Sequence, residues 1–509
     1  MFAATRRRLL SAAGTLAAVA AGVYACTAVR SEPPHPPAPT TLEIGTALPR
    51  AGVSGAGVGA VIQRLLGEPL LGTDRVGRVF GRLCEKWEWA AEGRILRLTL
   101  LANVRFHDGG LLTPDVAVDI LRTAFKRGGP LSFASVSKLV AVQPNTIDIH
   151  LSRIEAFLPS DIAEIPMVQP GSIGTGPFRL ESPNGTTLTS FTDYYQGRPA
   201  INRVEVKPYP TLRSAWTAMM RGDINMLYEV SAEAADFVEQ EPSVRSYPFL
   251  RPYYYLVAFN VRHPVLGKRE VRQALSQAVD REAVVRDAMD GRGEPADGPV
   301  WKYFWAYSGA ERTFRYNLEA ARLRLDSAGF PVRSGAKAVM PSRLQFTCLM
   351  YGEDPRFERV ALVLQKQLYD VGVDMRIESL PLERLTERIQ AGQFDAFLLE
   401  FVSGRSLSWP YRVWHSRPAG VPGPFDSGYR AADAVLDRLR HAITEVDTRQ
   451  GVGELQRIMF EDPPALFLAW PQSTRAVSAT IEVPKVADTD IVGRIAQFGR
   501  PAAGTGRQP

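Results

Sequence analysis

The chain has 509 residues, of which 45% are hydrophobic and 22% are charged, as is usual for a soluble globular protein. This length is too great for one simple core and indicates roughly two to four domains. The net charge of +6 falls to +3 once Arg6, Arg7 and Arg8 are set aside as part of a removable leader. No basic run follows them, so nothing indicates nucleic-acid binding. Three cysteines are too few for a disulfide scaffold, and the six histidines lack metal-binding spacing, so we expect no metal site.

Residues 1–26 have the parts of a secretory signal peptide. After the arginines, residues 9–24 are apolar or small, and Val23-Tyr24-Ala25-Cys26 resembles a bacterial lipobox, with Tyr24 where a small residue is usual. We expect the thiol of Cys26 to be diacylated and to anchor the mature chain; a plain signal peptide with an incidental cysteine is the alternative. The run TRRRLL at residues 5–10 also resembles a twin-arginine export signal, so both export routes stay open.

Residues 27–40 are predicted to be an extended tether, because the run from Ser31 to Thr40 is rich in proline. Apart from the leader, no stretch is apolar enough for a spanning helix, which needs about 20 residues. The last segment, residues 501–509, is expected to be disordered.

In the first half of the folded chain, alternating and 3.6-residue patterns predict a series of strands and helices. Strands are expected at residues 41–48, 186–191 and 203–209, and helices at 58–66, 114–126 and 212–220. Residues 95–106 should form a strand pair or one long strand. Thr113-Pro114 gives the second of these helices an N-cap followed by proline at its first position.

The second half alternates strands and helices more regularly. Strands are expected at residues 254–260, 344–350, 373–378 and 394–401, and helices at 271–279, 280–289, 318–328, 356–371 and 382–391. Asp280 is predicted to cap one helix, and Gly329 and Gly372 to end two others. This alternation predicts an α/β lobe with a largely parallel sheet.

Two motifs suggest enzyme chemistry, and we reject both. The run GAGVGA at residues 55–60 satisfies a dinucleotide-binding pattern, with Asp74 at the distance of a ribose contact. Export separates the chain from most NAD, however, and Asp74 lies in a predicted turn. Ser135 and Lys138 have SxxK spacing without the companion motifs of that enzyme class. Since GxSxG and HExxH are absent, we expect no enzymatic activity and no cofactor.

Ordered motifs over residues 42 to 482 resemble the extracellular solute-binding proteins of dipeptide, oligopeptide and nickel importers, family 5. The most specific block is VRQALSQAVDREAV at residues 271–284. The other blocks are LLGEPL (65–70), CEKWE (84–88), VRFHDG (104–109), GTGPF (174–178), YYQGRP (194–199), LVAFNVR (256–262) and YNLEAARLRLDSAGF (316–330). Any one of these is weak evidence, but together and in this order they are highly specific.

The resemblance implies an α/β fold of two lobes, with a two-strand hinge and an extra domain inserted in lobe one. Lobe one would comprise residues 41–80, 170–257 and 471–500, the inserted domain residues 81–169, and lobe two residues 258–470. The hinge crossings are expected near Val257-Ala258 and Ala469-Trp470.

The resemblance further implies an exported component of an ABC importer. It would act as a monomer on the periplasmic or outer side of the bacterial cytoplasmic membrane, close on a small solute, and deliver it to the permease and ATPase subunits. A second hypothesis is a sensor or interaction lipoprotein that has kept the fold without transport. A third, an exported hydrolase, has no supporting motif.

In peptide-binding relatives, an aromatic residue after the strand that ends at residue 401 precedes an aspartate that pairs with the ligand's amino group. Phe401 stands in the aromatic place, but no aspartate follows, and Arg405 has the opposite charge. Glu400 could supply a carboxylate, although strand alternation points it away from Phe401. We therefore expect a ligand other than a free dipeptide: an anionic, sugar-like, opine-like or N-blocked peptide-like compound.

The expected ligand-binding residues are those of this segment together with aromatic residues beside the hinge and one acidic residue. They are Glu68, Tyr253, Tyr254, Tyr255, Trp301, Trp305, Phe401, Ser403, Arg405 and Trp409. Core packing is the alternative role of each aromatic residue. Cys84 and Cys348 are interpreted as small buried hydrophobic residues, and their pairing stays open.

Overall fold

The structure is a computed structural model that describes residues 41–47, 57–309, 315–332, 342–416, 423–484 and 489–499. The predicted signal peptide, the lipobox residue Cys26, the tether and the tail of residues 501–509 lie outside these residues, so they stay predictions. None of the helices in the described segments is long and apolar enough to cross a bilayer.

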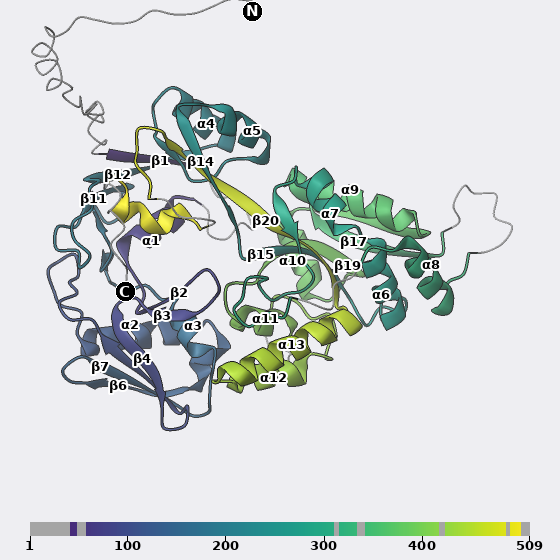
Figure 1. The fold of residues 1–509 in the computed structure, drawn as a ribbon, viewed down its shortest axis with the longest axis horizontal. Helices are drawn as coiled ribbons and strands as arrows, with labels where there is room; N and C mark the ends of the chain where they lie inside the picture. The colour runs from purple at the N-terminus through teal and green to yellow at the C-terminus, as the bar shows by residue number, and fades with distance from the viewer. Residues whose placement is uncertain are drawn as a thin grey trace, which may run out of the picture. The chain divides into compact units, whose positions relative to one another are not determined.

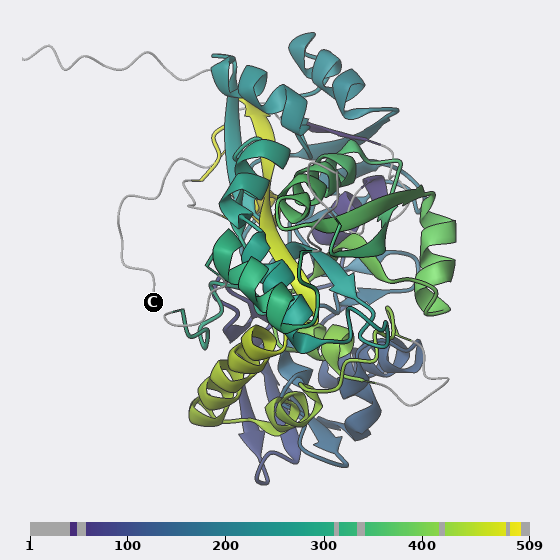
Figure 2. The same ribbon diagram turned by 90° about the vertical axis from the view of Figure 1, so that its right-hand side faces the viewer.

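The 14-residue strand β20 (Ala465–Ser478) lies in the middle of a mixed sheet that has 12 strands within the described residues. From edge to edge the order is β10 (Phe178–Leu180), β11 (Thr187–Ser190), β12 (Arg203–Tyr209), β1 (Thr41–Ala47), β13 (Met226–Leu227), β20, β15 (Tyr253–Phe259), β19 (Ala396–Val402), β17 (Leu344–Tyr351) and β18 (Val373–Leu380). Two further strands, β14 (Val244–Leu250) and β16 (Gly293–Pro295), also pair with β20. Figure 1 labels most of these strands, and Figure 2 shows β20 in yellow along its length.

One half of this sheet has its own hydrophobic core, and we call this part lobe one. Fully buried Leu42, Ile44, Phe178 and Val204 form its centre, and residues 477–483 and 491–498 near the end of the chain return to it. Its helices are α1 (Val58–Leu66), α4 (Leu212–Met220), α5 (Ala232–Gln240) and the 3-10 helix η3 (Ile491–Gln497).

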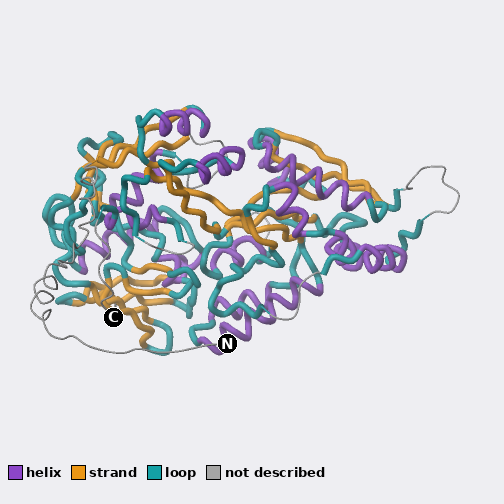
Figure 3. The backbone as a smooth tube through the Cα atoms, turned by 45° about the horizontal axis from the view of Figure 1, so that its top comes forward, coloured by secondary structure: helices purple, strands orange, loops and turns teal. Residues whose placement is uncertain are grey.

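Residues 70–167 enclose a separate core, and we call this part the inserted domain. Its sheet runs in the order β4 (Cys84–Ala90), β5 (Ile95–Leu100), β7 (Thr146–Leu151) and β6 (Val136–Val142). It also contains the hairpin of β2 (Leu71–Thr73) and β3 (Val79–Gly81), the helices α2 (Pro114–Lys126), η1 (Leu131–Ser135) and α3 (Leu158–Ile162), and, just beyond it, β8 (Val168–Gln169) and β9 (Ile173–Gly174). Figure 3 shows that its sheet is apart from the large one.

The other half of the large sheet forms lobe two, whose core runs almost entirely from Tyr254 to Trp470. Its helices are α6 (Arg269–Ala278), α7 (Arg281–Ala283), the π-helical turn η2 (Val284–Ala288), α8 (Leu318–Ser327), α9 (Pro355–Tyr369), α10 (Leu382–Gln390), α11 (Ser408–Trp414), α12 (Asp433–His441) and α13 (Glu445–Glu461). Because its strands β15 to β20 are joined by both parallel and antiparallel pairs, the expectation of a largely parallel sheet is wrong.

The two lobes are connected through β20 and through the passage from β14 to β15. β14 pairs with residues 472–478 of β20, whereas β15 pairs with residues 465–469. Pro252 and Pro471 lie between these two blocks of pairing, where each lacks the N–H that a continuous ladder needs. The expected domain boundaries stay predictions, and the pairing favours a crossing at Arg251-Pro252 over one at Val257-Ala258.

The local signals for helix ends are confirmed. Thr113 accepts a hydrogen bond from the N–H of Val116 at 3.4 Å, and Asp280 accepts one from Ala283 at 3.0 Å. Gly329 and Gly372 have φ values of +93° and +82°, in the left-handed region that favours glycine.

Two predicted elements differ from the structure. The strand that begins at Ile95 ends at Leu100, and the residues from 101 to 106 form a loop with turns. The helix expected at residues 280–289 is a short α-helical turn that continues as the π-helical turn η2. In both cases the apolar pattern continues past the point where the backbone hydrogen bonding changes.

Cys84 and Cys348 are buried, at 3% and 1% exposed, as the sequence predicts, and both are free, which the sequence left open. Burial raises the pKa of each thiol to about 12, so neither is a reactive thiolate near neutral pH.

Asp490 fastens the returning C-terminal segment to lobe one. Its two carboxylate oxygens accept hydrogen bonds of 2.9 Å from Nε and Nη2 of Arg475 on β20, and Arg64 of α1 donates a third at 2.9 Å. Burial alone would raise the pKa of Asp490, but the two arginines outweigh it and lower the pKa to about 2. The side chain of Arg475 is only 8% exposed, so the loss of its partner would leave a buried charge.

We predict that Asp490→Asn lowers the free energy of unfolding by about 3–5 kcal/mol at pH 7, the usual effect of breaking a buried ion pair. Since the folded pKa lies below the unfolded one, this contribution is present above pH ~4 and disappears as the pH falls towards 2. Urea unfolding of the wild type and the variant at pH 7 and at pH 2 measures this difference in the free energy of unfolding. Asp223→Asn, which breaks an exposed pair with Arg221, is the control and should change little. Equal effects of the two variants would contradict the prediction.

Candidate functional site

A pocket of about 540 Å³ opens between lobe one and lobe two beside the crossing of β20. Lobe one contributes the end of β1 and the first residues of α4 and α5. Lobe two contributes Tyr255, the end of η2 and the first turn of α9, and β20 contributes residues 471–474. A pocket lined by both lobes next to the connecting strands is suited to a ligand that holds the lobes together.

Three helices begin at this pocket. Thr211 and Ser214 form a reciprocal capping box at the start of α4, and Ser231 precedes α5. Asp354 caps α9, because its carboxylate accepts a hydrogen bond of 3.0 Å from the N–H of Arg356. The N-terminal end of a helix carries a partial positive charge, so the three helix starts favour an anionic group in the pocket.

Arginine side chains dominate the charged part of the lining. The lining contains Arg213, Arg292, Arg356 and Arg359 but only two acidic residues, Glu229 and Asp354.

On the lobe two wall, most of these arginines are held by acidic partners. Nη2 of Arg356 donates to Oδ2 of the buried Asp354 at 2.6 Å. Arg359 pairs with Asp290 at 3.0 Å. The Nε atoms of Arg292 and Arg359 are buried and make no hydrogen bond within the described residues, so the wall retains unused donors.

An ion pair lies beside the floor of the pocket. Glu400 of β19 stands directly opposite the pocket residue Tyr255 of β15, which puts both side chains on the same face of the sheet. Nη1 of Arg251 approaches Oε1 of Glu400 at 3.4 Å, and both side chains are 14% exposed. Burial, followed by the charge of Glu400, raises the pKa of Tyr255, so its hydroxyl stays protonated and able to donate.

The segment after β19 meets lobe one and the inserted domain. Arg405 is partly buried, and its Nε atom has no hydrogen-bond partner within the described residues. Burial lowers the pKa of Arg405, and the charges nearest to it include Asp490 and Arg64 of lobe one and Asp74 of the β2–β3 hairpin. An arginine at a domain junction with an unused donor can bind an anion.

The neighbours of Arg405 have structural roles. Phe401 packs against Phe397 and Phe425 in lobe two, with ring centroids 6.3 and 5.5 Å away. Ser403 is 1% exposed and donates a hydrogen bond of 2.8 Å to the carbonyl oxygen of Pro299. Gly404 has a φ of +61°, and a Cβ atom there would lie 2.5 Å from the ring of Trp409, so this position excludes the aspartate side chain.

The three tryptophans of the expected site lie where lobe two contacts the inserted domain. Nε1 of Trp301 donates to the carbonyl of Arg75 at 3.1 Å, and the N–H of Trp305 donates to that of Val76 at 2.8 Å. Nε1 of Trp409 donates to Glu164 at 3.2 Å. These rings hold the β2–β3 hairpin and the inserted domain in place, and none of them lines the pocket.

The remaining expected residues are separated from one another. Tyr254 is fully buried in lobe two and accepts a hydrogen bond from Trp414 at 3.1 Å. The ring of Tyr253 lies beneath the guanidinium of Arg251, 4.1 Å from its centroid. Glu68 is 5% exposed and pairs with Arg82 of the inserted domain and with Tyr194, which lies outside that domain.

Of the ten expected ligand-binding residues, Tyr255 alone lines the pocket. The wall around Asp354 and Arg356 is not among the predicted site residues, although the sequence contains a signal for it. The run Gly352-Glu353-Asp354-Pro355-Arg356 joins the end of a predicted strand to the start of a predicted helix, which is where α/β sheets place their binding groups. Glu400 is a second signal, because it is the charged residue in the otherwise apolar run AFLLEFV.

The two rejected motifs have structural roles. Asp74 closes its own turn by accepting hydrogen bonds from the N–H groups of Val76 and Arg78 at 2.9 and 2.8 Å. Ser135 is fully buried and donates to Glu155 at 3.0 Å. In the described part of the chain, no group of His, Cys, Asp or Glu side chains could hold a metal ion.

Comparisons with known proteins agree with this architecture. The family model described as "Bacterial extracellular solute-binding proteins, family 5 Middle" matches residues 78–420. The oligopeptide-binding protein AppA of Bacillus subtilis (strain 168) is 27% identical over 464 residues, which cover 83% of each chain.

Solved structures with low sequence identity share the fold. NikZ from Campylobacter jejuni, in complex with Ni(L-His), superposes with a TM-score of 0.73 at 18% identity, covering 90% of this chain and 99% of NikZ. The ABC transporter substrate-binding protein CtaP from Listeria monocytogenes has a TM-score of 0.78 at 18% identity, covering 91% and 99%. The two-lobed architecture expected from the sequence is therefore confirmed. Since the family model matches more than half of its residues, the chain belongs to the bacterial extracellular solute-binding proteins of family 5.

Proposed function

We propose that this chain is the solute-binding component of an ABC importer, and that it captures a small anionic or N-blocked solute in the pocket between its lobes. The observation that carries the proposal is the pocket of about 540 Å³ whose lining comes from lobe one, lobe two and β20 together. A ligand that contacts both lobes stabilises the form in which they are closed, because only that form offers both sets of contacts.

The connection between the lobes supports such closure. The chain passes between them at Arg251-Pro252 and at Trp470-Pro471, where the pairing of β20 changes from β15 to β14. Two strands that cross at one place can bend together while the cores on either side move as rigid bodies. The permease subunits would then bind the closed form.

The charge of the pocket supports an anionic ligand. Four arginines and three helix starts face the pocket, against two acidic residues. A carboxylate or similar group placed at the start of α9 would meet Arg356, the unused Nε of Arg359 and the positive end of the helix.

The segment after β19 argues against a free peptide amine. Gly404 leaves no room for a side chain, and Arg405 would repel an ammonium group nearby. A ligand with a blocked or absent amino group has no such conflict. Opine-like, sugar-like and N-acylated compounds with an acidic group satisfy both conditions.

The compartment is part of the same proposal. Family members are extracellular solute-binding proteins, and the proposed diacylated Cys26 would hold this one on the membrane surface through the tether of residues 27–40. Two acyl chains give stable anchoring, whereas one gives weak, reversible binding.

The ligand proposal predicts the outcome of a thermal-shift screen with purified protein. N-acetylated dipeptides, opine-like acids and acidic sugars should raise the melting temperature more than the free dipeptides of the same sequence. A ligand at ~100 times its Kd stabilises the folded form by about 2.7 kcal/mol. Larger shifts with free dipeptides would contradict the proposed ligand class, and the absence of any shift would favour the sensor hypothesis.

Arg359→Ala should weaken binding of the strongest acidic hit by about tenfold or more, which corresponds to about 1.4 kcal/mol, because Arg359 lines the pocket. Arg359→Lys keeps the charge but loses the planar donor group, so we expect an intermediate affinity. Arg384→Ala, which removes an exposed arginine of α10 outside the pocket lining, is the control for net charge and should leave affinity unchanged. Isothermal titration measures the affinity of all three variants, and an unchanged affinity for Arg359→Ala would rule out its role.

Cys26→Ser should move the protein from the membrane fraction to the soluble fraction of its native cells, because the acylated thiol is lost. Cell fractionation followed by immunoblotting measures this. Cys84→Ser changes a buried thiol in the folded body and is the control. A membrane-bound Cys26→Ser protein would contradict the lipid anchor.

A further inference from the structure

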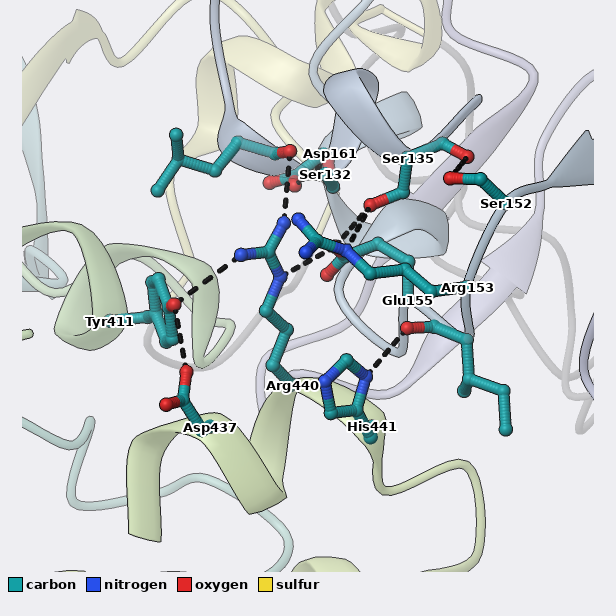
Figure 4. Close-up of polar contacts among 12 residues, drawn as sticks. Ser132, Ser135, Ser152, Arg153, Glu155, Asp161, Tyr411, Asp437, Arg440 and His441 are labelled. Atoms are coloured by element: carbon teal, nitrogen blue, oxygen red, sulfur yellow. Dashed lines mark hydrogen bonds and ion pairs between the residues drawn. The ribbon is translucent and has the colours of Figure 1, made fainter. Parts of the chain in front are cut away.

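A second junction joins lobe two to the inserted domain, away from the pocket. On the inserted domain it contains Glu155, in the loop between β7 and α3. On lobe two it contains Arg440 of α12 and Tyr411 of α11. Figure 4 shows that the guanidinium of Arg440 lies among groups from both sides.

Arg440 uses all three of its nitrogens across or beside this junction. Nε donates to Oε2 of Glu155 at 2.6 Å, and Nη2 donates to the carbonyl oxygen of Leu131 at 3.1 Å, both on the inserted domain. Nη1 donates to the hydroxyl of Tyr411 at 3.3 Å within lobe two. The arrangement requires the planar guanidinium, since a lysine ammonium group could not make these three hydrogen bonds in their different directions at once.

The backbones of the two parts are joined around the same pair. The N–H of Ala156 donates to the carbonyl of Arg440 at 2.7 Å, and Nδ1 of His441 lies 2.7 Å from the carbonyl oxygen of Ile154. Ser135 fixes Glu155 from the inserted domain by donating to the same Oε2 atom at 3.0 Å. The acceptor is therefore positioned before Arg440 reaches it.

The ion pair is deeply buried. The side chain of Glu155 is 0% exposed and that of Arg440 is 8% exposed. The second oxygen of Glu155, Oε1, is buried without a hydrogen-bond partner in the described residues. A buried carboxylate with one oxygen unsatisfied depends on its single cationic partner, and the removal of that partner leaves an uncompensated charge.

This dependence exists only while the junction is closed. The inserted domain and lobe two have largely separate cores, and the only chain connections from lobe two lead into lobe one. When the lobes open, Glu155 and Arg440 would separate and both would be solvated by water.

We propose that Glu155 and Arg440 form a closure latch between the inserted domain and lobe two, which controls how much of the protein is closed before ligand arrives. This inference rests on the proposed closure of the lobes. It assigns part of the binding affinity to residues that do not touch the ligand, because a receptor that is rarely closed binds more weakly.

The latch can be tested by double electron–electron resonance, which measures the distance between two spin labels. The labels are attached to Lys126→Cys of α2 and Arg384→Cys of α10 in a Cys26→Ser background without ligand. Short distances report the closed form and long distances the open form. Cys84 and Cys348 are buried and should stay unlabelled. Arg440→Met should reduce the ratio of short to long distances by about tenfold or more, since it leaves Glu155 buried and unpaired only in the closed form. Glu155→Gln combined with Arg440→Met removes both charges and should restore at least half of the lost short-distance fraction.

The matched control is Arg438→Met, two residues earlier on α12, whose ion pair with Glu454 of α13 lies within lobe two and is exposed. It should leave the distances unchanged. A folded Arg440→Met protein with the wild-type distribution would overturn the proposal, as would an equal effect of Arg438→Met. If Arg440→Met fails to fold, the double variant and Glu155→Gln alone are measured instead. The proposal is also overturned if neither of these variants changes the distances. Because no ligand is present, the result is independent of whether the proposed ligand class is correct.

Discussion

The sharing of β20 between two halves of one sheet constrains everything else in this protein. In this single 14-residue strand, residues 465–469 pair with β15 and residues 472–478 pair with β14. The lobes are therefore joined by main-chain hydrogen bonds on each side of a short interruption. Pro252 and Pro471 mark this interruption, because proline cannot donate to the ladder. The place where pairing breaks is also where the pocket lies.

Two sets of charged groups have different roles in the structure. Asp490 with Arg475 and Arg64 fixes the returning chain within lobe one. Arg356 and Arg359 are held on the wall of the pocket, with one Nε donor unused. The charges around Asp490 are paired, as in a structural ion pair. The wall of the pocket keeps a donor without a partner, which makes it a candidate binding group.

The expectation about the missing aspartate is now explained by the backbone as well as by the residue type. Gly404 adopts a left-handed conformation against the ring of Trp409, so a side chain at this point would be strained and would collide with the ring. The resemblance identifies the segment, whereas its local geometry shows that Gly404 has no room for a side chain. The pocket's arginines are consistent with the same ligand preference.

The sequence by itself determined the family, most of the strands and helices between residues 254 and 401, the caps at Thr113 and Asp280 and the burial of both cysteines, because these depend on local patterns and motif order. It did not determine which aromatic residues face solvent or ligand: Tyr254 and Tyr255 are adjacent in one strand, yet Tyr254 lies in the core and Tyr255 lines the pocket. Alternation assigns them to opposite faces but does not say which face meets lobe one. The wall at Arg356, the floor beside Glu400 and the pairing of Glu155 with Arg440 join residues far apart in the chain. Only the tertiary structure decides such contacts, because they depend on how separate cores pack against one another.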